Sequence, residues 1–145
     1  MAFRFSLATV LRFRESVEKR EELALQKILL EMARVRREIE RITADIAAAH
    51  EARNRAMQNP LPASHVHGML NDAEVAKERR KNLLQALVGL EKQHQLQTQK
   101  YQAAHRDRQM LSDMRARKQD VYEQERARAT QKFLDDIFAA RSHRN

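Results

Sequence analysis

Between residues 25 and 49, apolar side chains recur at alternating intervals of three and four positions. The series is Leu25, Ile28, Met32, Val35, Ile39, Ile42, Ile46 and Ala49. This spacing places every member on one narrow stripe of an α-helix, the a/d seam of a heptad repeat. Such a stripe is buried most readily against a second helix. The sequence therefore predicts an all-α coiled coil.

The same register extends towards the N-terminus, but its apolar character is interrupted. It reaches Leu11 and Leu7 only by crossing Arg14, Glu18 and Glu21. Charged side chains are costly at a seam unless they are paired. We therefore expect the seam to shift towards Val17 and Ala24 in this region, or to weaken.

A second run of heptad spacing lies further along the chain and is poorer in apolar residues. It begins with Leu83, Leu87 and Leu90 and continues through polar side chains such as His94 and Gln97. Long polar side chains can lie along a seam with their polar ends at its edge. This run is therefore predicted to be the partner of the first.

The segment NPLPASHVHG, residues 59–68, separates the two runs. It holds both prolines and one of the two glycines. Proline lacks the amide hydrogen of a helical hydrogen bond and disfavours helix in the preceding residue. We predict helices over about 6–58 and 69–140, with a loop over about 59–68 and an N-cap at Asn71 or Asp72. Helices joined in this way form an antiparallel coiled-coil hairpin, here one domain over residues 1–145.

The predicted second helix is longer than the first and overhangs it. Residues beyond about 123 would extend past the first helix by ~30 Å. They include an apolar stripe made of Phe133, Leu134, Ile137 and Phe138. Burying each of these side chains is worth roughly 1.5–3 kcal/mol, yet the hairpin offers nothing to bury them against. Such a patch indicates a binding surface; a frayed terminus, self-association, or coverage by the first few residues are the alternatives.

Aromatic residues are concentrated at the start of the chain. Three of the seven, Phe3, Phe5 and Phe13, lie within the first thirteen positions. In a hairpin that turns near residue 63, Phe5 and Leu7 would lie opposite Val121 and Tyr122. The opening aromatic residues are therefore expected to have partners within the chain.

No pattern in the sequence indicates catalysis. The chain has no cysteine, and His65 and His67 alone make an incomplete metal site. Gly-rich phosphate loops and nucleophile motifs are absent, and a two-helix hairpin lacks a concave pocket. We therefore expect no enzyme activity, cofactor, metal or small-molecule substrate. No stretch of eighteen apolar residues predicts a membrane span.

The net charge of +8 comes from an interspersed mixture of both signs. Mixed charges are typical of a solvated helix face with local pairs. An acidic protein partner fits this surface as well as a nucleic acid does, and the continuous basic block of a basic-zipper protein is missing. A basic nucleic-acid-binding coil and a hairpin dimer forming a four-helix bundle remain as alternatives.

The opening segment FRFSLATVLRFRESVEKREELALQKIL resembles the N-terminal signature of the flagellar FliJ family. The matching positions are Phe5, Leu7, Val10, Leu11, Arg14 and Leu25. The resemblance implies a two-helix coiled coil similar to the central stalk of rotary ATP synthases. It also implies a monomeric, cytoplasmic component of the flagellar type III export apparatus at the inner face of the cell membrane.

The resemblance further implies three partners: the flagellar export ATPase, the export gate membrane protein and export chaperones. The tip that faces the ATPase would comprise Phe3, Phe5, Leu7, Leu11 and Arg14 with Phe133, Leu134, Ile137 and Phe138. The gate would be contacted nearer the turn, in the region of Leu70 and Val75. Nucleic acid is not among the implied partners.

Overall fold

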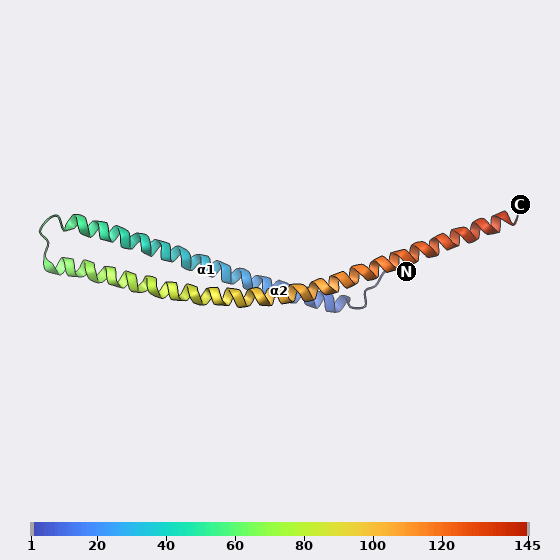
Figure 1. The fold of residues 1–145 in the computed structure, drawn as a ribbon, viewed down its shortest axis with the longest axis horizontal. Coiled ribbons are helices and arrows are strands. Elements are labelled where there is room, and N and C mark those ends of the chain that lie inside the picture. Colours follow the sequence, from blue (N-terminus) through green and yellow to red (C-terminus); the bar gives the residue numbers. More distant parts are fainter. Residues whose placement is uncertain (1, 145) are drawn as a thin grey trace. The chain divides into compact units, whose positions relative to one another are not determined.

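Two α-helices make up almost the whole chain. The computed structural model describes residues 2–144. Helix α1 spans Ala8–Ala56 and helix α2 spans Ala63–Ser142, with no strand among the described residues. The chain reverses direction between them, so that α2 returns antiparallel to α1 (Figure 1). The predicted all-α hairpin is confirmed.

The turn is shorter than predicted, because α2 begins at Ala63 rather than near residue 69. The carbonyl oxygen of Pro62 accepts hydrogen bonds from the amides of His65 (3.0 Å) and Val66 (3.3 Å). Pro62 therefore stands at the start of the helix, where its missing N–H costs nothing. Gly68 lies inside α2 with a negative φ, and so it does not end a helix.

The chain divides into two compact units, and each helix contributes a segment to both of them. The terminal unit contains the residues up to Glu21 together with those from Tyr101 onwards, and the turn unit is Glu22–Lys100. Each unit pairs a segment of α1 with a segment of α2.

In the turn unit, the apolar stripe of α1 is its least exposed face. Met32, Val35 and Ile42 are buried. Four further members of this stripe are half-buried: Leu25, Ile28, Ile39 and Ile46. On α2, the predicted seam residues Leu83, Leu87 and Leu90 are half-buried as well. Ala49, nearest the turn, is exposed.

Ion pairs cross between the helices at the edges of this stripe. The Arg79 guanidinium lies 2.9 Å from the Glu38 carboxylate, and Arg36 lies 3.9 Å from Glu91. These pairs are exposed to solvent and contribute little to stability individually. They show which residues of α1 and α2 face each other.

Candidate partner-binding surface

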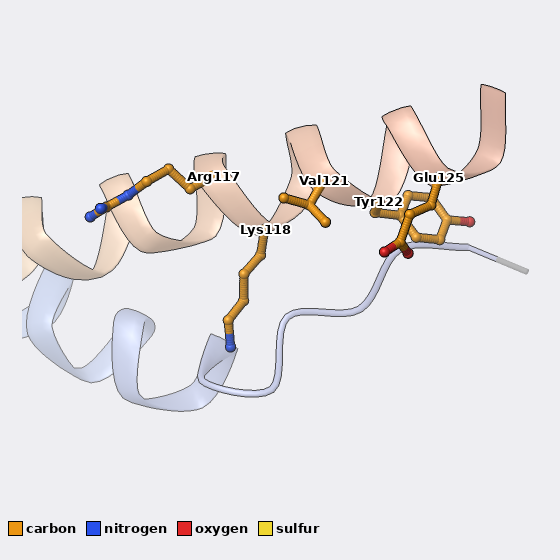
Figure 2. A pocket seen from close by; sticks show the side chains of 5 residues that line it. All are labelled: Arg117, Lys118, Val121, Tyr122 and Glu125. Atoms are coloured by element: carbon orange, nitrogen blue, oxygen red, sulfur yellow. The ribbon is translucent and has the colours of Figure 1, made fainter. Parts of the chain in front are cut away.

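The first residues of the chain form a non-helical segment, which we call the N-terminal strap (residues 2–7). It runs along α2 before α1 begins (Figure 2). The Phe3 ring lies 5.6 Å from the Tyr122 ring, and the Lys118 ammonium lies 5.7 Å from the centre of the Phe5 ring. Phe5 is only 8% exposed. The strap therefore uses its aromatic residues to attach itself to α2.

These partners differ from the expected ones by about one helical turn. The sequence places Phe5 opposite Val121 and Tyr122. In the structure Phe5 lies beside Lys118, and it is Phe3 that contacts Tyr122. The expectation treated these residues as helical, but residues 2–7 are not, and a non-helical segment covers more length per residue than a helix. Both contacts are made by the non-helical strap, which precedes the start of α1 at Ala8.

Beyond the strap, the seam of the terminal unit contains charged side chains. The Arg108 Nε donates to a Glu18 carboxylate oxygen at 2.7 Å, and Arg108 also donates to the Ser112 hydroxyl at 3.3 Å. The Arg14 guanidinium lies 3.3 Å from Asp107. Charge is retained at these positions because each helix supplies the opposite sign.

The apolar parts of this seam lie on either side of the charged pairs. Leu11 of α1 and Ala104 of α2 are buried, and Leu7 is half-buried. Arg14, Glu18 and Glu21 are half-buried as well, so the heptad register continues through them. Of the two outcomes expected from the sequence, a shift or a weakening, the seam shows the second: it keeps the charged positions, and Val17 and Ala24 are half-buried beside them.

The Glu18 carboxylate also affects the ionisation of its partner. Its hydrogen bond raises the pKa of the Arg108 guanidinium above the ordinary value, and this outweighs the opposite effect of desolvation. A cation whose pKa is raised on folding contributes its stability at every pH below the unfolded value. The stabilisation from Arg108 should therefore be constant across the neutral range.

Replacing Glu18 by alanine is expected to lower the free energy of unfolding by about 1 kcal/mol, because Arg108 is left half-buried without its carboxylate. A double-mutant cycle with Arg108→Ala, followed by thermal denaturation, measures the coupling between the two side chains. Glu31→Ala is the control, since it removes an exposed pair with Arg34 that lies within one helix. Equal effects of the two glutamate substitutions would contradict a special role for the seam pair.

The C-terminal end of α2 carries the second predicted set of site residues. Phe133, Leu134 and Phe138 are 64%, 42% and 66% exposed, and Ile137 is half-buried. We call these four residues the C-terminal apolar stripe. None of them is buried, which leaves a row of large apolar side chains open to solvent.

The structure does not bring the strap and the stripe together. Phe3 contacts Tyr122, and Phe133 follows Tyr122 by eleven residues, or ~16 Å along the helix. The idea that the first residues fold over the stripe is therefore wrong. The five N-terminal members of the predicted tip pack on the hairpin, and the four C-terminal members do not.

Sequence reasoning missed several residues that shape this end of the chain. Lys118 lines a shallow hollow of ≈360 Å³ with Arg117, Val121, Tyr122 and Glu125. Figure 2 shows the Lys118 side chain extending from α2 towards the start of α1. The pairing of Glu18 with Arg108 could have been inferred from opposite charges at two heptad positions, had the loop length been known.

The described residues contain no group of three or more His, Cys, Asp or Glu side chains arranged to hold a metal ion. In the part of the chain that the structure covers, neither helix has an apolar stretch long enough to cross a membrane.

Comparison with known proteins gives one match. A family model described as "Flagellar FliJ protein" matches residues 3–145, nearly the whole chain. No curated protein and no solved structure matches. The chain therefore belongs to the FliJ family, and it is a component of the flagellar protein-export apparatus.

Proposed function

We propose that the chain is a non-enzymatic, stalk-like component that binds the ring of the flagellar export ATPase and links this ring to the export gate and to export chaperones. The C-terminal apolar stripe makes the principal contact with the ATPase. The observation that carries the proposal is the exposure of Phe133, Leu134 and Phe138 on one helix. Exposed apolar side chains grouped in this way mark interaction sites in soluble proteins.

The N-terminal members of the predicted tip have a supporting part in this proposal. Phe5 and Leu11 are buried against α2, and Phe3, Leu7 and Arg14 are half-buried. They hold the strap and α1 onto α2 and so stiffen the helix just before the stripe. The accessible edges of Phe3 and Arg14 can add contacts at the rim of the ATPase interface.

The gate and the chaperones would bind elsewhere on the chain. Leu70 and Val75 are exposed near the start of α2, in the region that the family resemblance assigns to the gate. An exposed apolar side chain can anchor a partner where a core residue cannot. In this proposal a single copy of the chain works in the cytoplasm, at the inner face of the cell membrane.

Removing residues 123–145 tests the ATPase contact. We expect a chain that ends at Tyr122 to keep its hairpin, because Phe3 still has its ring partner, but to be lost from pull-downs on the immobilised flagellar export ATPase. Circular dichroism of the shortened chain is the control for folding. Equal recovery of the shortened and complete chains would contradict the proposal, and light scattering that shows a dimer only for the complete chain would favour the self-associating alternative.

A further inference from the structure

A hollow with a different chemistry lies beside the N-terminal strap. It has a volume of ≈430 Å³ and is lined by Phe3, Arg4, Phe5, Ala8, Arg12, Glu15 and Arg115. Its three arginines come from three segments: Arg4 from the strap, Arg12 from α1 and Arg115 from α2. We call it the arginine hollow.

The arginines of this hollow lack the carboxylate partners that other arginines of the chain have. Arg14 and Arg108 each form an ion pair across the seam. Among the described residues, Arg4, Arg12 and Arg115 form no ion pair and no side-chain hydrogen bond. The lining holds a single carboxylate, and the first turn of α1 contains no acidic residue. Three guanidinium groups and one carboxylate leave the hollow with an excess of positive charge, which attracts anions.

Apolar side chains also contribute to the lining of the hollow. Phe5 is buried there, and Phe3 and Ala8 are half-buried. Guanidinium groups bind carboxylates and phosphates through paired hydrogen bonds of fixed geometry. A small inorganic anion would satisfy the arginines but would leave the half-buried Phe3 ring in contact with water. A peptide that carries carboxylates beside a large apolar side chain would satisfy both.

We propose that the arginine hollow binds an acidic segment of a partner protein, in which one or two carboxylates flank a large apolar side chain. The carboxylates pair with Arg4, Arg12 and Arg115, and the apolar side chain covers the exposed part of the Phe3 ring. The volume of the hollow is in the range of sites that hold small ligands. The site uses none of the four residues of the C-terminal apolar stripe, and it does not require the partner to be the export ATPase.

Fluorescence anisotropy with a labelled synthetic peptide of sequence Glu-Asp-Asp-Ile-Phe-Glu tests the site in the complete chain. We expect Arg12→Gln combined with Arg115→Gln to weaken binding of this peptide by about tenfold or more, because two charge-assisted contacts are lost. Arg126→Gln combined with Arg128→Gln is the matched control. It removes the same charge from exposed positions of the same unit that do not line the hollow, so it should change the affinity less than about threefold.

Further peptides separate the two parts of the recognition. The neutral peptide Gln-Asn-Asn-Ile-Phe-Gln should not bind measurably, and the acidic peptide Glu-Asp-Asp-Gly-Ser-Glu should bind more weakly than the first. The proposal is overturned if both arginine pairs weaken binding equally, or if the neutral peptide binds as well as the acidic one. Binding of phosphatidylglycerol vesicles that depends on Arg12 and Arg115, without binding of the peptide, would overturn it in favour of a membrane surface.

The test of the arginine hollow and the test of the proposed ATPase contact give results that can be distinguished. Loss of peptide binding in the Arg12 and Arg115 variant, with recovery on the immobilised ATPase unchanged, would place the two contacts on separate partners. Peptide binding that persists in a chain without residues 123–145 would show that the hollow works without the stripe. A failed ATPase pull-down therefore leaves the test of the hollow intact.

Discussion

Replacing Val35 by aspartate is expected to destabilise the hairpin strongly, because Val35 is the least exposed of the buried side chains. Val35 is 3% exposed in the middle of the best apolar stripe. The substitution removes a buried aliphatic side chain and places a carboxylate between the helices, at a combined cost of about 3–5 kcal/mol. Most domains have little more stability than this. Thermal denaturation followed by circular dichroism should show a much lower midpoint or a largely unfolded chain.

Leu30→Asp is the matched control for this substitution. Leu30 lies five residues away in the same unit and is 72% exposed, so the same chemical change should leave the midpoint nearly unaltered. The Val35 variant should also recover stability on acidification, since burial raises the pKa of a carboxyl group and protonation removes the buried charge. If Val35→Asp melted like the unmodified chain, the heptad assignment would be untenable.

Replacing Phe133 and Phe138 together by alanine is expected to reduce the affinity for the export ATPase by about a hundredfold, if each ring loses roughly 1.5 kcal/mol or more of burial at the interface. Both side chains are already open to solvent in the chain on its own, so their removal takes away little packing. Helicity and the thermal midpoint should therefore stay close to those of the unmodified chain. Calorimetric titration against the ATPase measures the affinity.

Phe13→Ala provides the comparison for this double substitution. Phe13 is 61% exposed on the other helix of the same unit, and it lies outside the stripe. Its removal should leave the affinity for the ATPase within a few-fold of the original value. A large fall in the midpoint of the Phe133 and Phe138 variant would mean that these rings stabilise the fold, and the stripe would no longer be a candidate interface.

The class of fold could be predicted from the sequence because the residues of α1 that face α2 are apolar and recur with heptad spacing. The three- and four-residue spacing from Leu25 to Ile46 leaves no alternative to a helix paired with another helix. The boundary of α2 was harder to predict. Prolines and glycines both disfavour the interior of a helix. Here, however, Pro62 directly precedes α2 and Gly68 lies inside it.

The face that α2 turns to α1 is only partly marked by hydrophobicity, through Leu83, Leu87 and Leu90. In the turn unit its half-buried positions recur with heptad spacing, but many are small or polar, among them Ala73, Ala76, Arg80, His94 and Gln97. The part of this face before Leu83 carries too few large apolar residues to be recognised from the sequence. The arginine hollow was missed for a related reason, since Arg4, Arg12 and Arg115 converge only when the strap has been placed on α2.

The pairs of Glu18 with Arg108 and Arg14 with Asp107 have a consequence for how the two helices are aligned. Apolar layers do not by themselves select one pairing of two helices, whereas pairs of opposite charge do, since each charge has one matching position on the other helix. A slide of seven residues would bring Arg14 opposite Met114 in one direction, or Glu18 opposite Tyr101 in the other. Because either displacement leaves a half-buried charge without its partner, the two pairs favour the observed register of α1 and α2 in the terminal unit over its neighbours.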